Sequence, residues 1–306
     1  MTISSPATPR ASSISAEGTH RGALRPIDWA LLLGSGLIWG ASFLLIAEGL
    51  ESFEPGVVTF TRIAFGYLAL SLVRSSRVTV DRADWPRIAA VGVTWLAFPM
   101  TLFPLAQQHI SSSLAGMLNG AIPVFVALVA TIALRRAPGR WQLIGIAVGV
   151  IGLVLIGVPS LTEDSSTALG VVLIVTAVVS YGIAINLCVP LTQRYGSLPV
   201  LWRSQAVALV LTAPFALTGL GDSSWQTSSF VACVVLGVFG TAIAFVLMTT
   251  LAARVGPTRA SALTYVEAAA ALGLGIAVRG DSVATIEVVG CATVLAGAWF
   301  TGRAEH

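Results

Sequence analysis

The 306-residue sequence has few charged residues and contains no lysine. Only 10% of its residues are charged, against about 25% in ordinary soluble domains. So few charges cannot cover a water-facing surface, which excludes a soluble globular protein. A hydrophobic content of 56% excludes a disordered chain as well. Without lysine there is no Walker A motif, because that motif places a lysine on the phosphates.

Cysteine and histidine are also scarce. The three cysteines, Cys188, Cys233 and Cys291, all lie inside apolar runs and are expected to be small buried residues. The three histidines are far apart, and no residues have metal-ligand or acyl-transfer spacing. The sequence therefore predicts no cofactor, no metal and no enzymatic activity. No nucleic-acid binding is expected either, because the arginines are scattered among loops.

Apolar segments recur along the whole chain, and each is long enough to cross about 30 Å of hydrocarbon. They predict an all-α membrane protein with ten transmembrane helices. The predicted spans are 29–47, 57–73, 87–106, 113–134, 141–158, 169–189, 199–218, 229–251, 259–278 and 284–301. Residues 1–28, rich in Ser, Ala, Thr and Pro, are expected to form a disordered cytoplasmic tail. Ten spans leave no extramembrane domain, so the function must lie among the helices.

The arginines alternate along the chain in a way that predicts the orientation. With the N-terminus inside, every arginine except Arg62 and Arg279 falls in an inside segment. The outside segments are acidic or neutral, with Glu48, Glu51, Glu54, Glu163, Asp164, Asp222 and Asp281. Arginine excess in cytoplasmic loops is the main determinant of membrane topology. The pattern therefore supports ten helices with both termini in the cytoplasm.

The chain also matches itself when it is shifted by 145 residues. Gly145, Gly152 and Gly157 then fall on Gly290, Gly297 and Gly302, and Gly92-Val93 falls on Gly237-Val238. Five helices per half is an odd number, so a second half with the same fold must run through the membrane upside down. The prediction is two inverted five-helix repeats, residues 29–158 and 169–302. Such repeats are a transporter architecture, with the binding site near the midplane between the halves.

Glycines four residues apart indicate where helices approach closely. Gly36 and Gly40, Gly116 and Gly120, and Gly145 and Gly149 each share one helix face. Small residues at this spacing let membrane helices pack backbone to backbone.

Short motifs follow in order along the predicted helices. They are Leu37-Ile-Trp-Gly-Ala-Ser-Phe, Arg62-Ile-Ala-Phe, Ala115 with Ile122-Pro123-Val-Phe, Ala244-Phe245, and Arg259-Ala-Ser-Ala-Leu before Glu267. With the glycine spacing, they resemble the drug/metabolite transporter superfamily, and within it the EamA-type permeases, over roughly residues 29–302. The resemblance implies export of a solute from the cytoplasm of a bacterial cell, driven by protons or by the solute gradient.

The sequence departs from the family pattern at three places. Ala268 stands where the family usually has a proline after the acidic residue of the ninth helix, which argues against a proline-shaped bend there. Arg136-Ala137 and Gly280-Asp281 stand where each half commonly has Gly-Glu. No mechanism that depends on those glutamates is carried over.

Arg62 lies inside the second predicted helix, 12 residues from Arg74 and so about 18 Å from the inner boundary. A charge at this depth costs roughly 2.5–3.5 kcal/mol by the milder scales, so it should face a cavity or a partner. One hypothesis is that its planar guanidinium group binds a substrate carboxylate. The alternatives are a structural pair with Glu48, Glu51 or Glu54, or extension toward the outer surface.

Glu267 lies roughly 14 Å from the inner face in the ninth predicted helix. A carboxyl at this depth is a candidate to carry a proton or to meet a substrate ammonium. The alternatives are a hydrogen bond to a neighbouring helix or an ion pair with Arg62.

Uncharged polar and aromatic residues complete the candidate site. These are Asn119, Tyr181, Asn186, Gln205, Tyr265, Trp39, Trp95 and Trp202. Ligand sites consist of apolar walls with a few placed polar groups. The alternatives are hydrogen bonds between helices for the polar residues and lipid-facing or interfacial anchoring for the tryptophans.

The leading hypothesis is a secondary transporter of a small metabolite, such as an amino acid, working by alternating access across the plasma membrane. Its expected partners are the solute, the lipid bilayer and protons as a coupling ion, and a homodimer is left open. The alternatives are a multidrug efflux or nucleotide-sugar-like permease, and a non-transporting membrane scaffold, sensor or intramembrane enzyme.

Overall fold

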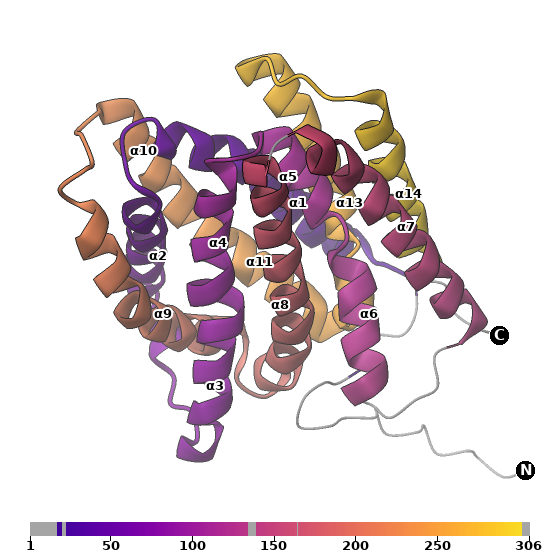
Figure 1. The fold of residues 1–306 in the computed structure, drawn as a ribbon. Helices are drawn as coiled ribbons and strands as arrows, with labels where there is room; N and C mark the ends of the chain where they lie inside the picture. Colours follow the sequence, from indigo (N-terminus) through magenta and orange to yellow (C-terminus); the bar gives the residue numbers. More distant parts are fainter. Residues whose placement is uncertain (1–16, 20–22, 134–138, 164, 302–306) are drawn as a thin grey trace, which may run out of the picture.

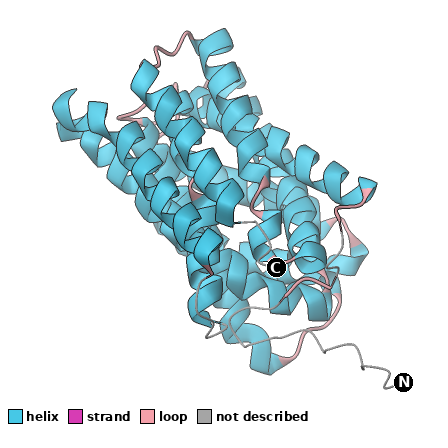
Figure 2. Ribbon diagram, turned by 90° about the vertical axis from the view of Figure 1, so that its right-hand side faces the viewer, coloured by secondary structure: helices cyan, strands magenta, loops and turns pink. Residues whose placement is uncertain are grey.

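The computed structural model describes residues 17–19, 23–133, 139–163 and 165–301 (Figure 1). Throughout these residues the regular structure is helical and no strand occurs (Figure 2). The all-α prediction is therefore confirmed.

Helices of the first half follow the predicted apolar runs. They are α1 (Pro26–Leu50), α2 (Pro55–Ser71), α3 (Trp85–Val91), the π-helical turn η3 (Gly92–Ala97), α4 (Phe98–Gln107), α5 (Ser112–Asn119), α6 (Ile122–Ala133) and α7 (Arg140–Glu163). Two short 3₁₀ turns, η1 (Arg74–Arg77) and η2 (Arg82–Asp84), connect α2 to α3. The segment α3–η3–α4 is continuous, whereas α5 and α6 are separated by a break at Gly120 and Ala121.

Helices of the second half repeat this plan. They are α8 (Ser165–Tyr195), α9 (Ser197–Gly219), α10 (Thr227–Val235), the π-helical turn η4 (Leu236–Ile243), α11 (Ala244–Val255), α12 (Pro257–Ala260), α13 (Leu263–Leu274), the π-helical turn η5 (Gly275–Arg279) and α14 (Thr285–Thr301). A second break, at Ser261 and Ala262, separates α12 from α13.

Local sequence explains where several helices begin and end. Pro26, Pro55 and Pro257 occupy first helical positions, where a missing N–H costs nothing. Ser111 caps α5, because its side chain accepts a hydrogen bond from the Leu114 N–H at 3.2 Å. Gly196 turns the chain between α8 and α9 with a φ of 80°, which a residue with a side chain rarely adopts.

Eight helical segments of the described chain are long and apolar enough to cross a membrane by length and composition. The other two are α14, a shorter apolar helix, and α2, which has 17 residues and carries Arg62. The chain is a multi-pass membrane protein. That all ten segments span, in inverted halves, stays a prediction. The described helices exceed most predicted spans by a few residues, and α8 runs through Pro190 to Tyr195.

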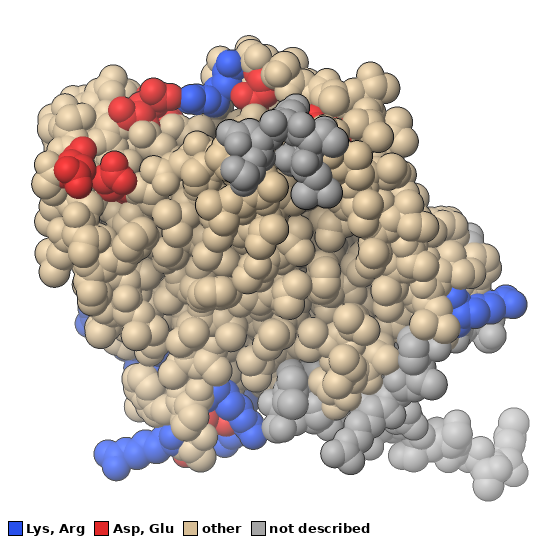
Figure 3. Space-filling model, in the orientation of Figure 1, with Lys and Arg blue, Asp and Glu red and all other residues tan. Residues whose placement is uncertain are grey.

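Charged side chains gather at the two ends of the molecule, and the belt between them is almost uncharged (Figure 3). We call one of them the acidic end, which contains the loops 51–54, 220–226 and 280–284. The other is the arginine end, which contains residues 72–84, 196 and 256. Arg279 pairs with Glu51 at 2.6 Å at the acidic end. Arg254 pairs with Asp28 at 2.6 Å, and Arg194 with Asp84 at 2.8 Å, at the arginine end. Each pair joins residues of different halves.

Several residues used for the orientation lie outside the described part of the chain: Arg10, Arg21, Arg135, Arg136, Arg303 and Asp164. Of the predicted tail, residues 1–16 and 20–22 also lie outside it. Residues 26–28 belong to α1, and the carbonyl of Glu17 accepts a hydrogen bond from Gln193 at 2.7 Å.

Glycine seams hold the helices at close range, as predicted. A Cβ at Gly40 would lie 2.8 Å from the carbonyl oxygen of Glu267, so α1 and α13 touch backbone to backbone. A Cβ at Gly152 would lie 2.5 Å from the backbone nitrogen of Val294 and 2.7 Å from the Gly290 oxygen. Helices α7 and α14 therefore pack against each other through glycines at the edge of the bundle (Figure 1).

This contact gives a prediction for stability. Gly152→Ala should lower the unfolding free energy by about 1–3 kcal/mol, because the added methyl forces the two backbones apart. Thermal unfolding in detergent measures the change. The matched control is Gly273→Ala in α13, where a Cβ meets nothing within 4 Å. Equal melting temperatures for the two variants would contradict the close packing.

Candidate functional site

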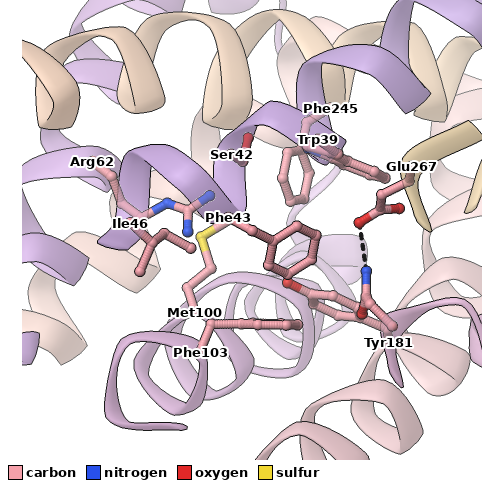
Figure 4. A pocket seen from close by; sticks show the side chains of 11 residues that line it. Trp39, Ser42, Phe43, Ile46, Arg62, Met100, Phe103, Tyr181, Phe245 and Glu267 are labelled. Carbon is pink, nitrogen blue, oxygen red and sulfur yellow. Dashed lines mark hydrogen bonds between the residues drawn. The ribbon is translucent and has the colours of Figure 1, made fainter. Parts of the chain in front are cut away.

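A pocket lies among seven helices in the interior of the bundle (Figure 4). The space between its side chains, including the part that opens to solvent, is about 360 Å³. Its walls combine aromatic and aliphatic groups with a few polar ones. They are formed by Trp39, Ser42, Phe43, Ile46, Arg62, Met100, Phe103, Asn119, Tyr181, Phe245 and Glu267.

Helix α1 supplies the largest share of the walls. Trp39, Ser42, Phe43 and Ile46 follow the i, i+3, i+4, i+7 spacing and so lie on one helix face. The Trp39 indole N–H donates a hydrogen bond to the carbonyl of Gly240 in η4 at 2.8 Å, which holds the ring at the pocket wall.

Arg62 projects from α2 into one side of the pocket (Figure 4). Its side chain is almost fully buried, and its Nε donates a hydrogen bond to the Thr241 hydroxyl at 3.2 Å. Among the described residues, no carboxylate pairs with it and neither Nη group has a hydrogen-bond acceptor. Arg62 therefore presents two cationic N–H groups to the pocket without a protein anion.

The structure shows neither of the two alternatives predicted for Arg62. The described residues hold no Arg62 pair with Glu48, Glu51 or Glu54, and Glu51 pairs with Arg279 instead. With 4% of its surface exposed, Arg62 does not extend to the molecular surface.

Glu267 occupies another wall, on α13 (Figure 4). Its Oε1 accepts a hydrogen bond from the Asn119 amide on α5 at 2.6 Å. Its Oε2 and the Asn119 Oδ1 are buried and have no hydrogen-bond partner in the structure. The carboxyl is bound to a neighbouring helix rather than paired with Arg62, and one oxygen remains for a ligand or a proton.

Aromatic rings form the wall between these polar groups. Phe43 contacts Phe103 edge to face at 5.7 Å, and Phe103 stacks on Tyr181 at 5.7 Å. Trp39 meets Phe245 edge to face at 5.0 Å. Rings in such contacts are held in place by their neighbours, so the pocket walls are well defined.

Five predicted site residues line this pocket, namely Trp39, Arg62, Asn119, Tyr181 and Glu267, and the other five do not. Trp95 is fully buried one layer behind, with its ring 5.0 Å from that of Phe245. Tyr265 is partly buried outside the lining.

Three of the remaining predicted residues join helices. Asn186 donates to the carbonyls of Val126 and Gly182 at 3.0 and 2.9 Å. Gln205 donates to the Thr241 carbonyl at 2.6 Å. Trp202 donates to the Ser71 hydroxyl at 2.8 Å. For Asn186 and Gln205 these are the interhelical hydrogen bonds given as the alternative for polar residues, whereas the alternative given for Trp202 was lipid-facing or interfacial anchoring.

Six lining residues were absent from the prediction: Ser42, Phe43, Ile46, Met100, Phe103 and Phe245. The signal for three of them was available, because their spacing from Trp39 places them on its helix face. Met100, Phe103 and Phe245 carry no such signal, because apolar residues on a membrane helix face lipid as readily as a cavity.

The departures at Ala268 and Gly280-Asp281 have visible consequences. Helix α13 runs unbroken through Ala268. Asp281 accepts hydrogen bonds from the hydroxyls of Ser112 and Ser113 at 2.9 and 2.8 Å and from the Ser113 N–H at 3.0 Å. It thereby ties the second half to the start of α5. Arg136-Ala137 lies outside the described residues.

Comparisons with known proteins match nearly the whole chain. The EamA-like transporter family matches residues 29–158 and 168–303. The chain is 25% identical to "Uncharacterized transporter YdfC" of Bacillus subtilis (strain 168), over 90% of each protein. It is 27% identical to "Uncharacterized inner membrane transporter YedA" of Escherichia coli (strain K12), over 82% of each. A solved crystal structure aligns over 91% of this chain and 97% of the chain in that structure, with a TM-score of 0.65 and 16% sequence identity. The two proteins therefore share a fold.

The contact between Asn119 and Glu267 gives a prediction. Asn119→Ala should lower the unfolding free energy by about 1.5–3 kcal/mol, because it leaves a buried carboxyl without its donor. In a Glu267→Ala background the same substitution should cost much less. A double-mutant cycle by thermal unfolding in detergent measures the coupling. Additive losses would show that the two side chains do not stabilise each other.

Proposed function

The chain belongs to the EamA-like transporter family, and from this premise we propose that it exports a small metabolite, such as an amino acid, across the plasma membrane of a bacterial cell. The protein is a secondary transporter that works by alternating access. Its two halves, residues 29–158 and 169–302, have opposite orientations in the membrane, and both termini are cytoplasmic.

The polarity of the pocket is the observation that carries this proposal. Arg62 offers two free Nη groups, and Glu267 offers one free carboxyl oxygen, in the same cavity. A zwitterionic solute matches both: its carboxylate binds the guanidinium fork, and its ammonium binds Glu267. The aromatic rings of the same pocket suit the apolar side chain of such a solute. When no solute is bound, Glu267 takes up a proton, which couples export to proton entry.

Local features that recur in both halves support the inverted repeat. The third segment of the first half contains the π-helical turn η3, and its counterpart contains η4. The fourth segments are both broken, at 120–121 and at 261–262. Discontinuous helices near the interface of inverted repeats are the usual location of solute and ion sites in transporters.

The two ends supply the contacts that alternate. At the acidic end, Glu51 binds Arg279. At the arginine end, Asp28 binds Arg254. The Glu51–Arg279 pair is partly exposed and contributes only about 0–1 kcal/mol, so the acidic end can open at modest cost, whereas the buried Asp28 makes the arginine end costlier to open. We infer that this alternation gives the pocket access to each side of the membrane in turn.

Flux into liposomes that contain only this protein tests the proposal. Glu267→Gln should abolish the response of amino-acid flux to an imposed pH gradient, because the amide cannot take up the proton.

Arg62→Ala should weaken solute binding by roughly 10–100-fold, because a charge-assisted contact is lost. Glu48→Gln, in the last turn of α1 and outside the pocket lining, is the matched control. If all four proteins show equal flux, the pocket is not the pathway, and flux confined to bulky organic cations would indicate a multidrug permease.

The orientation gives a separate prediction. A cysteine introduced at Asp222 should react with an impermeant maleimide on intact cells, whereas one at Arg77 should react only after permeabilisation. Both positions are exposed, and the native cysteines of the described chain are buried. Labelling in the reverse pattern would invert the proposed topology.

A further inference from the structure

The Arg62 side chain reaches the pocket with its Nε–H already in a hydrogen bond. The Thr241 hydroxyl is the acceptor of its Nε, and in the described chain it is the one hydrogen-bond partner of this guanidinium. Thr241 is fully buried and does not itself line the pocket. The position of the two free Nη groups therefore depends on a residue from the other half of the chain.

The π-helical turn η4 determines which way the Thr241 hydroxyl points. Its Oγ1 donates to the carbonyl of Leu236, five residues earlier, at 3.3 Å. Threonines in α-helices bond instead to the residue three or four positions back, as Thr249 does with Phe245 at 2.7 Å. Because the hydroxyl proton is used in η4, the oxygen is left as an acceptor for Arg62.

Close packing of α2 against η4 brings the two residues within reach. A Cβ at Gly237 would lie 2.7 Å from the carbonyl oxygen of Arg62, so the backbones touch at this point. A Cβ at Gly66 would lie 2.9 Å from the Thr241 methyl, so the glycine leaves room for that methyl.

Two further side chains hold the turn in place. The carbonyl of Thr241 accepts the Gln205 amide at 2.6 Å, and the carbonyl of Gly240 accepts the Trp39 indole at 2.8 Å. A π-helical turn disrupts the regular hydrogen-bond ladder, and these donors from α9 and α1 satisfy its carbonyls. The turn that carries Thr241 is thus held by hydrogen bonds from α9 and α1 and by packing against α2.

We propose that Thr241 is a positioning residue, whose hydroxyl orients the Arg62 guanidinium so that its planar fork meets a substrate carboxylate. This inference rests on the proposed function, in which Arg62 is the anion anchor. Without the hydroxyl, Nε loses its acceptor and the guanidinium rotates toward other partners. The fork is then no longer aligned for two parallel hydrogen bonds, whereas contacts with a neutral solute are unaffected.

Binding of benzoate and of its neutral analogue benzamide to the purified full-length protein tests the proposal. The wild type should prefer benzoate, and Thr241→Val should bind it roughly tenfold more weakly with benzamide unchanged. Thr241→Ser should restore the preference, because it keeps the hydroxyl. Thr249→Val is the matched control, since that buried threonine bonds only to its own helix.

The outcomes separate the inference from the function on which it rests. If Arg62→Ala loses the benzoate preference while Thr241→Val keeps it, Thr241 does not position the guanidinium, and the anchor stands. If the wild type shows no preference, or Arg62→Ala retains it, the anchor itself is wrong and the inference is wrong with it. Melting temperatures of the free variants establish folding, and Thr241→Ala replaces the valine variant if that protein unfolds.

Discussion

Burial of two ionisable side chains in an apolar helix bundle is the constraint on which the rest of this structure depends. Neither Arg62 nor Glu267 can remain in hydrocarbon without polar contacts, because each would cost several kcal/mol. The protein supplies one contact to each, from Thr241 and from Asn119, and does not pair the two with each other. Because their remaining polar atoms have no partner among the described residues, the cavity between them stays polar.

Irregular backbone surrounds this cavity and is satisfied by side chains. The carbonyls of η4 accept Trp39 and Gln205, and in η3 the carbonyl of Thr94 accepts the Ser180 hydroxyl at 2.6 Å. In a membrane such carbonyls cannot turn to lipid, so irregular backbone occurs only where protein or a water-filled cavity covers it. The turn η4 therefore holds Trp39 at the pocket wall and presents the Thr241 hydroxyl to Arg62.

The contacts between the halves differ in strength along the molecule. In the middle, glycines bring the backbones of α1 and α13 into direct contact. At the ends, the Glu51–Arg279 pair is partly exposed, whereas Asp28 and the serine hydroxyls that donate to Asp281 are buried. Packed glycine surfaces permit small sliding movements, and exposed polar contacts exchange readily with water. Of these end contacts, the partly exposed Glu51–Arg279 pair is therefore the weakest.

The sequence by itself determined the membrane class, the approximate helices and the separation of arginines from acidic residues, because each follows from local composition and length. It also identified Arg62 and Glu267, since an isolated charge within an apolar run needs no neighbour to be noticed. Only the tertiary structure decided that Asn119 meets Glu267 across 148 residues, that Gln205 turns to a backbone carbonyl, and that Phe103 and Phe245 face the pocket. Periodicity defines a face on each helix, but which face meets a cavity, a neighbour or lipid depends on how the helices pack together.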